Sequence, residues 1–320
     1  MIPRWNPIIT CINQGLCTLK RLAQQVIPKR KGRGAKPKRD VVKYGFLIAL
    51  KEFDKRTLRG AETHLSKLVC NERIDHSVIA YWENKPEMMK LISQFISVAG
   101  AVLDKVLSSL FTFVDSTKFS SWKVDEIEFT LCNRIAKGTV YPIGISFLKD
   151  KVVSPVKEAV PQGRGFLYVD AWYDDNATIK ELFEKGYFPV VCPNKNRYRG
   201  YWRKKARRIY RQPINRLGYR QRGRGEIVFG ALTNCYGDRL DAVNITAMQT
   251  RIAARTLSYQ IKLLIRVGNV VLVLIVRHVP LLAFILSLSF PLYLSIGLLL
   301  CSRLYFLQAI GTPNFKLATL

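Results

Sequence analysis

The chain has 320 residues, enough for one large domain or two smaller ones, and a formal net charge of +28 at pH 7, which indicates a polyanionic partner, either nucleic acid or an anionic membrane surface. Its seven cysteines form no CxxC pair and suggest reduced thiols in a cytosolic protein, while its three histidines argue against a His-rich zinc site and a Ser-His-Asp triad. A metal site in this chain must therefore be built from carboxylates, which suit magnesium or manganese.

The first 39 residues form a basic arm in our interpretation. Residues 1–28 are weakly amphipathic and predict a short helix, and they lack the basic region and continuous apolar block of a signal peptide. Residues 29–39 are basic and interrupted by glycine and proline. Lys36, Lys38 and Arg39 in this linker either follow phosphates along a groove or belong to a solvated flexible arm, and the sequence favours neither.

Residues 40–110 predict an all-helical module. Apolar residues over 41–50 recur at helical spacing, with Asp40 as the N-cap. Further helices are expected over three ranges, 57–69, 77–83 and 87–110, with a break at residues 84–86. We expect His64 and His76 to be helix-surface or capping residues rather than metal ligands.

Short apolar runs of strand-like composition follow the helical module. We expect strands over residues 111–117, 139–148, 152–160, 166–169 and 187–191, with a turn at 149–151 and a helix over 178–185 that Gly186 ends. This order is the plan of the ribonuclease H-like fold, an α/β fold with a mixed sheet flanked by helices. In that plan the first and fourth strands are neighbours, so Asp115 and Asp170 at their ends meet at one sheet edge.

A strongly basic segment covers residues 194–225. It carries thirteen Lys and Arg residues and no acid, and tyrosines and a tryptophan are interleaved with them. Cations with aromatic rings suit phosphates and unstacked bases, although a solvated helix face is the alternative. Because like charges repel, we expect poor order without a polyanion. The candidate DNA contacts in its centre are Trp202, Arg203, Lys204, Lys205, Arg207 and Arg208.

Glu226 opens a predicted helix that gives way at residues 236–238, and a second helix is expected over 241–267. A carboxylate at a helix N-terminus has an ordinary explanation, since it complements the helix dipole. Together with Asp115 and Asp170, however, it gives three acids that could converge on a pair of divalent cations.

These residues resemble the insertion-sequence DDE transposases, in particular the group with the Tyr-x2-Arg-x3-Glu-x6-Lys signature. Tyr219, Arg222 and Glu226 stand at that spacing, whereas Thr233 occupies the Lys position. The resemblance covers roughly residues 30–265 and includes the helical module, which it suggests is a DNA-binding and dimerisation module.

The contexts of the two aspartates carry the same resemblance. Asp115 lies in Val-Asp-Ser-Thr, typical of the family's first acid, and Asp170 lies in Asp-x-x-Tyr, with Tyr173 as the tyrosine. The resemblance implies that residues 111–266 form the catalytic domain, with 194–225 as a basic insertion.

The implied activity is metal-dependent cleavage of transposon ends and strand transfer into target DNA. Asp115, Asp170 and Glu226 would hold two Mg²⁺ or Mn²⁺ ions, which activate a water and stabilise the leaving oxygen. Tyr219 and Arg222 would hold a phosphate if the helix of Glu226 extended back to them, an extension that three nearby glycines argue against.

Three further expectations accompany that activity. Thr233 removes an expected phosphate contact, for which Lys118 is a candidate replacement. The partners would be double-stranded DNA, both transposon ends and target, and a second copy in a homodimeric synaptic complex. The protein would be cytoplasmic and associated with the nucleoid.

Residues 267–320 form a hydrophobic tail that does not fit a nuclease. Residues 279–302 are a continuous uncharged run of 24, long enough to span a bilayer, although Pro280 and Pro291 weaken that prediction. The tail is either the frameshifted end of a decayed element or a membrane helix that contacts the bilayer. The alternatives to an active transposase are therefore an inactive DNA-binding relic and a basic membrane-anchored protein.

Overall fold

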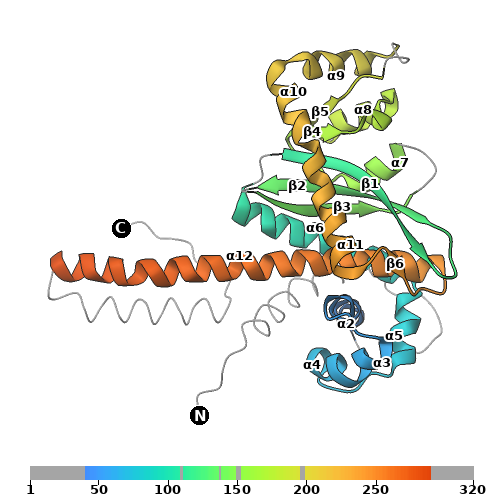
Figure 1. Cartoon of the computed structure of the whole chain (residues 1–320), viewed down its shortest axis with the longest axis vertical. Helices are drawn as coiled ribbons and strands as arrows, with labels where there is room; N and C mark the ends of the chain where they lie inside the picture. Colours follow the sequence, from blue (N-terminus) through green and yellow to red (C-terminus); the bar gives the residue numbers. More distant parts are fainter. Residues whose placement is uncertain (1–39, 109–110, 137, 149–152, 195–198, 290–320) are drawn as a thin grey trace. The chain divides into compact units, whose positions relative to one another are not determined.

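The computed structural model describes residues 40–289 apart from 109–110, 137, 149–152 and 195–198 (Figure 1). The chain divides into two units, Met1–Leu264 and Ile265–Leu320, and every element that positions the candidate site lies in the first. The basic arm with Lys36, Lys38 and Arg39 lies outside the described residues, as do residues 290–320 of the tail.

The N-terminal module is helical, as predicted. Its helices are α2 (Val41–Phe53), α3 (Leu58–Gly60), α4 (Ser66–Cys70), α5 (His76–Glu83) and α6 (Pro86–Leu107), and a π-helical turn, η1 (Ala61–Leu65), joins α3 to α4. Asp40 is the N-cap of α2, where its side chain accepts the N–H of Val42 at 3.1 Å. The last helix ends three residues earlier than expected, because Ser108 adopts a left-handed conformation with φ of 55°.

The sheet is mixed, as predicted. Its strands are β1 (Phe111–Ser121), β2 (Ile127–Ala136), β3 (Thr139–Ser146), β4 (Gly165–Val169) and β5 (Tyr187–Val191), in the order β3-β2-β1-β4-β5. The first three strands are antiparallel neighbours, and β4 runs parallel to both β1 and β5. A two-residue strand, β6 (Arg239–Leu240), pairs with the far end of β1.

One strand assignment from the sequence was wrong, and one strand was missed. The run 152–160 is helix α7 (Val153–Ala159), because Val153, Val156 and Ala159 recur three residues apart and place Val156 and Ala159 in the core. Pro155 fits the first turn of this helix, where no backbone N–H is needed. Strand β2 was not predicted. It lies between β1 and β3 in the sheet, so residues 139–148, which we expected to form the second strand, contain the third strand, β3. The expected turn at 149–151 lies outside the described residues.

The basic segment is largely helical from residue 201 onward, whereas we expected poor order without a polyanion. After β4 come the 3₁₀ turn η2 (Ala171–Tyr173), α8 (Asn176–Glu184) and β5, and then α9 (Tyr201–Arg211) and α10 (Pro213–Arg220). Helix α9 packs against β5 and α8, and its Ala206 is buried. Arg203 and Arg207 of α9 lie beside the buried carboxylate of Asp174, so an internal acid takes up part of the positive charge.

The chain continues helically from α10 through the 3₁₀ segment η3 (Gln221–Gly225) into α11 (Glu226–Tyr236), and the last helix is α12 (Ile245–Ser289). Helix α12 begins four residues later than predicted, after Asn244, whose side chain accepts the N–H of Ala247 at 2.8 Å. In the part of the chain with described residues, no helix is apolar over enough length to span a bilayer. The second half of the candidate span 279–302 lies outside that part.

A buried ionic cluster attaches α2 to α12 within the first unit. Glu52 at the end of α2 accepts from Arg251 and Arg255 of α12, at 2.8 and 3.0 Å, and Lys51 lies 3.2 Å from the same carboxylate. Lys51 also pairs with the buried Glu83 of α5. Since these side chains are almost completely enclosed, the helical module and the last helix are joined by charges that have little access to water.

Candidate active site

Strands β1 and β4 bring the two predicted aspartates together. Their parallel register pairs Val114 with Val169, so Asp115 and Asp170 occupy the next position on adjacent strands. Asp115 is within β1, and its Oδ1 accepts the N–H of Ser116 at 2.9 Å. Asp170 follows β4 and caps η2 by accepting the N–H of Ala171 at 2.6 Å. The backbone of the sheet therefore holds both carboxylates at one edge.

The third acid approaches this edge on the helical run of α10, η3 and α11. Glu226 is the first residue of α11, and Gly225 before it has φ of −59° and ψ of −30°. A Cβ on Gly225 would lie 3.6 Å from the Cβ of Phe113, two residues before Asp115 on β1. Helix α11 thus begins next to the strand that carries the first aspartate.

The glycines did not break this helix, which corrects the expectation from the sequence. Gly225 is in right-handed helical conformation. Gly218 lies so close to the hydroxyl of Tyr168 on β4 that an added Cβ would be 2.2 Å from it. These glycines let the helix approach the sheet, so Tyr219, Arg222 and Glu226 lie on one helical run.

Arg222 lies between the two aspartates. Its Nη1 is 3.4 Å from Oδ2 of Asp115, and its Nη2 is 3.8 Å from Oδ1 of Asp170. One turn earlier, Tyr219 packs edge-on against Tyr210 with ring centroids 5.4 Å apart. Burial raises the pKa of Tyr219 to about 12, so its hydroxyl remains protonated at neutral pH and can donate a hydrogen bond.

The three carboxylates influence one another electrostatically. The pKa of Asp115 is raised, mainly by burial and further by the charges of Asp170 and Glu226, while the N–H of Ser116 and the guanidinium of Arg222 act in the opposite direction. The positive charge of Arg222 therefore does not fully offset the effects of burial and of the neighbouring acids on the pKa of Asp115. Carboxylate oxygens are the hard donors that divalent cations such as Mg²⁺ or Mn²⁺ prefer. Among the described residues, however, the ligand atoms of these three acids do not all lie within 4.8 Å of one another.

A hydroxyl network behind the aspartates joins their two strands. The hydroxyl of Tyr173 lies 2.6 Å from Oγ of Ser116, which is 2.8 Å from Oγ1 of Thr130 on β2. Burial raises the pKa of Tyr173, so this hydroxyl remains protonated. The network fixes the turn after Asp170 to the strand of Asp115. Sequence reasoning named Tyr173 but gave no role to Ser116, which lies in the predicted strand 111–117, or to Thr130, which lies in the unpredicted strand β2.

The predicted DNA contacts on α9 fall into two groups. Arg203 donates to the backbone carbonyl of Asp174 through Nε and Nη2 at 3.1 and 2.6 Å, and Arg207 lies 3.9 Å from the carboxylate of Asp174. These two arginines have internal partners. Lys204, Lys205 and Arg208 are exposed.

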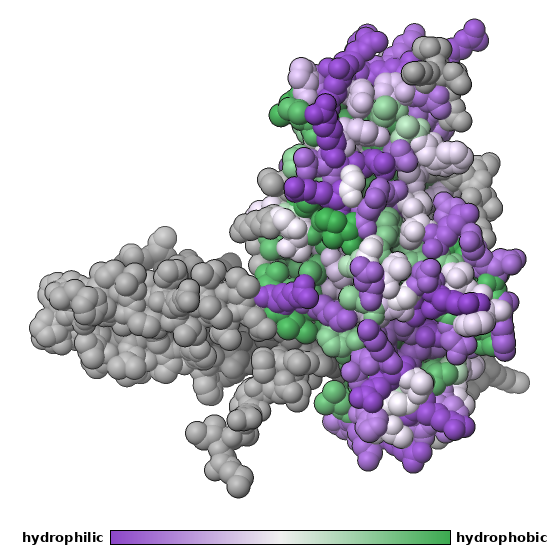
Figure 2. Space-filling model, in the orientation of Figure 1, coloured by the Kyte–Doolittle hydropathy of each residue, from purple (hydrophilic) through white to green (hydrophobic). Residues whose placement is uncertain are grey.

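Trp202 is half-buried against Phe183, and Lys205 lies 4.3 Å above the Phe183 ring. On the face seen in Figure 2, hydrophilic side chains are frequent over α9 and α10, although α10 also exposes the apolar Ile214 and Leu217. The exposed cations of α10 and η3 that extend this surface are Arg216, Arg220 and Arg224.

Lys118, the candidate replacement for the missing lysine of the signature, is paired with an exposed acid away from Asp115. Side chains alternate along a strand, so Lys118 lies on the opposite face of β1 from Asp115. Its ammonium group is 3.5 Å from Glu126, and both side chains are exposed. Thr233 is exposed on α11, two turns after Glu226.

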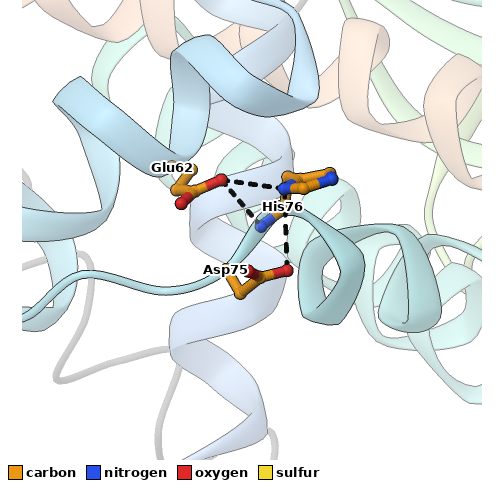
Figure 3. A group of neighbouring side chains, drawn as sticks. All are labelled: Glu62, Asp75 and His76. Atoms are coloured by element: carbon orange, nitrogen blue, oxygen red, sulfur yellow. Dashed lines mark hydrogen bonds and ion pairs between the residues drawn. The ribbon is translucent and has the colours of Figure 1, made fainter.

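A second group of ligand-type side chains lies in the helical module: Glu62, Asp75 and His76 (Figure 3). Glu62 accepts from Arg73 Nε at 2.8 Å and from the N–H of His76 at 3.2 Å, and its carboxylate lies 2.9 Å from His76 Nδ1. Asp75 caps α5 through the N–H of Ser77. Asp75 rather than His76 is the N-cap of α5, and His76 is the first residue of that helix, with both its N–H and its ring next to the carboxylate of Glu62.

Comparison with known proteins identifies one similarity. The family model described as Transposase DDE domain matches residues 149–261. The matched range contains Asp170, Arg222 and Glu226, whereas Asp115 precedes it. No curated protein and no solved structure matches the chain.

Proposed function

We propose that the chain is an insertion-sequence DDE transposase of the Tyr-Arg-Glu-Lys signature group, with a ribonuclease H-like catalytic core. It cleaves DNA at transposon ends and joins those ends to target DNA. The observation that carries this proposal is the position of Arg222 between Asp115 and Asp170, with Glu226 near enough to Asp115 for its charge to act on it. The match of residues 149–261 to a transposase DDE domain and the mixed sheet order support it.

The acids fit a pair of divalent cations. Asp115, Asp170 and Glu226 would hold two Mg²⁺ or Mn²⁺ ions, since all their donor atoms are hard carboxylate oxygens. When bound, such ions lower the pKa of a water and stabilise the charge on a leaving oxygen. Burial, and to a smaller extent the charges of Asp170 and Glu226, raises the pKa of Asp115, and a bound cation would oppose both effects.

The reaction has two displacement steps at phosphorus. In the first, a water oxygen bonds to the phosphorus at the transposon end, the bond to the 3′ oxygen breaks, and a 3′-hydroxyl and a 5′-phosphate remain. In the second, that hydroxyl bonds to a target phosphorus and displaces another 3′ oxygen. Arg222 holds the reacting phosphate by its forked donors, and the protonated Tyr219 donates to a phosphate oxygen.

The surface around the site supplies the affinity for double-stranded DNA. Lys204, Lys205 and Arg208 on α9 contact the backbone, because each neutralised phosphate releases counterions. Arg203 and Arg207 instead position α9 through Asp174. The helical module of residues 40–110 binds DNA or a second copy, and a homodimer aligns two transposon ends.

A nicking assay tests the proposal. The full chain is incubated with Mg²⁺ and a supercoiled plasmid that carries the ends of its own element. Wild type should nick the plasmid, and Asp115→Ala should reduce nicking at least a hundredfold while DNA binding persists, as expected for loss of a metal ligand. Asp54→Ala, at an exposed carboxylate after α2, is the matched control and should nick normally. Nicking by Asp115→Ala at the wild-type rate would refute the proposal.

A second candidate function is a DNA-binding relic without catalysis. Thr233 stands where the signature has lysine, and Lys118 lies on the wrong face of β1 to replace it. In this case wild type binds the plasmid without nicking it, and Thr233→Lys restores nicking. Efficient nicking by the wild-type chain excludes this candidate.

A further inference from the structure

The turn that carries Asp170 also carries a second, buried acid. Asp170 and Asp174 stand at the two ends of the 3₁₀ turn η2, where Asp170 accepts the N–H of Ala171 and the N–H of Asp174 donates to the carbonyl of Ala171 at 3.1 Å. The side chain of Asp170 is 41% exposed, whereas Asp174 is 2% exposed. Burying a carboxylate is costly unless charged or hydrogen-bonded partners surround it, so the partners of Asp174 indicate its role.

The carboxylate of Asp174 holds the basic segment at two places. Its Oδ2 accepts the N–H of Asn194, at the start of that segment, at 2.9 Å. On α9, Nε of Arg203 lies 3.3 Å from Oδ1, and Nη2 of Arg207 lies 3.9 Å from Oδ2. Arg203 also donates to the backbone carbonyl of Asp174. One residue of the turn η2 is thus bound both to the chain that follows β5 and to α9.

A neighbouring side chain fixes the start of α9 to the same region. Oδ1 of Asn176, the first residue of α8, accepts the N–H of Trp202 at 3.1 Å. Gly200, the N-cap of α9, has φ of 120°, and a Cβ added to it would lie 2.5 Å from the same oxygen. Helix α9 therefore has a defined position relative to η2, and it cannot move along the sheet without breaking these contacts.

The outer side of α9 carries cations that are free of this attachment. Lys204 and Arg208 are exposed, whereas the side chains of Arg203 and Arg207 are 13% and 16% exposed. Residues four apart lie on one side of a helix, so Lys204 and Arg208 share the outer side, and Arg203 and Arg207 share the side toward Asp174. Helix α9 thus joins a phosphate-binding surface to the turn of the second catalytic acid.

We propose that Asp174 is a positioning residue that selects the phosphate to be cut. This inference rests on the proposed function, in which the exposed cations of α9 bind the DNA backbone and Asp170 belongs to the reacting site. Because Asp174 joins α9 to the turn of Asp170, a duplex bound on α9 is held at a fixed distance from the acids. Successive phosphates of one strand are about 3.4 Å apart along the duplex axis, so a displacement of α9 by that distance changes which bond is cut.

The affinity for DNA and the position of the cut should therefore depend on different residues. The outer cations of α9 determine how tightly DNA binds, and Asp174 determines which bond reaches the acids. Asparagine at position 174 keeps the shape of the side chain and an acceptor for the N–H of Asn194, but it removes the charge that attracts Arg203 and Arg207. The helix then retains its cations and loses its fixed distance from Asp170.

Mapping of nicks tests the inference. The full chain is incubated with Mg²⁺ and a supercoiled plasmid that carries the ends of its element, and the position of each nick is mapped to the nucleotide. Wild type should nick one bond at each end. Asp174→Asn should bind the same DNA at least as tightly as wild type, but it should nick about 10- to 100-fold more slowly, as expected for a misplacement of about 1 Å, with nicks spread to adjacent bonds.

Three further variants separate positioning from binding and from folding. Lys204→Gln should weaken DNA binding and reduce the salt slope of the binding constant by about 1, yet it should nick the wild-type bond. Arg207→Gln removes only one partner of Asp174 and should show the same spread of nicks in weaker form. Asp175→Asn is the matched control, because it removes a charge 3.8 Å from Arg203 while asparagine still caps α8, and it should behave as wild type.

Three results would overturn the inference, and they are distinct from failure of the proposed function. Nicks confined to the wild-type bond in Asp174→Asn, whether fast or slow, show that this acid does not select the phosphate. Nicks by wild type at several adjacent bonds show that nothing selects it. Wild-type affinity and salt slope in Lys204→Gln show that α9 does not hold the DNA.

Two other outcomes are also decisive. If Asp174→Asn does not fold, the nick positions of Arg207→Gln decide in its place, and nicks confined to the wild-type bond overturn the inference. If wild type binds the DNA without nicking it, or does not bind it, the proposed function itself fails, and the positioning role fails with it.

Discussion

Replacing Glu52 by glutamine should destabilise the protein through the buried cluster between α2 and α12. Glu52 is 4% exposed, and its two oxygens accept from Arg251 and Arg255. Glutamine keeps the size of the side chain but removes its charge. The positive charges of Lys51, Arg251 and Arg255 then face only Glu83 among the buried acids of this cluster.

The pKa of Glu52 gives the magnitude. Burial alone would raise this pKa, but Lys51, Arg251 and Arg255 together outweigh burial and lower it from 4.5 to about 2. That difference corresponds to roughly 3 kcal/mol of stability at neutral pH. Breaking one partner of a buried ion pair costs about 3–5 kcal/mol, which agrees. Because the folded pKa is lowered, this stabilisation is complete above pH 4.5 and is lost as the pH falls towards 2.

Denaturant unfolding of wild type and Glu52→Gln measures the effect. At pH 7 the variant should lose about 3 kcal/mol of unfolding free energy, and the difference should shrink as the pH approaches 2. Asp54→Asn is the matched control, because Asp54 also follows α2 but forms an exposed ion pair with Arg56 and should cost at most about 1 kcal/mol. The reasoning is refuted if Glu52→Gln costs no more than this control, or if its effect does not depend on pH.

Three other changes have defined outcomes. Asp115→Asn should stabilise the protein at pH 7, because burial raises the pKa of Asp115 and disfavours its ionised form; thermal unfolding should show the gain disappear below pH 3.8, and a loss of stability would contradict it. Gly218→Ala should cost about 1–3 kcal/mol in denaturant unfolding, since its Cβ would lie 2.2 Å from the hydroxyl of buried Tyr168; an unchanged midpoint would contradict this. Tyr173→Phe should cost about 1 kcal/mol, and a double-mutant cycle with Ser116→Ala should show coupling between the two hydroxyls.

The helices and the parallel part of the sheet could be predicted because their signals are local. Asp40 before an apolar stripe marks the start of α2, and Gly186, with φ of 90°, marks the end of α8. Strand β2 was hidden because buried polar residues interrupt its apolar pattern, among them Thr130 and Asn133. Helix α7 was mistaken for a strand because a short apolar run is compatible with both a strand and a helix if the spacing of its apolar residues is not considered.

The charged residues of the site could be predicted from the sequence, whereas the residues that hold neighbouring side chains in place, such as Asp174, could not. Asp115 and Asp170 follow apolar runs, and Arg222 precedes Glu226 at a recognisable spacing. By contrast, the role of Asp174 depends on a contact with α9, far along the chain. A run of positive charges does not reveal which of its members will meet a buried acid, so Arg203 and Arg207 could not be distinguished from their exposed neighbours.

Because β1 pairs with β4, the distance between Asp115 and Asp170 does not depend on the number of residues between them in the chain. The parallel pairing of β1 with β4 and the hydrogen bond between Ser116 and Tyr173 set the Asp115–Asp170 separation, so insertions and deletions in the intervening loops leave it unchanged. Glu226 differs, because its place depends on a helix that touches the sheet through Gly218 and Gly225. During evolution, length variation should therefore accumulate between the two aspartates, while the segment from Gly218 to Glu226 keeps a constant number of residues.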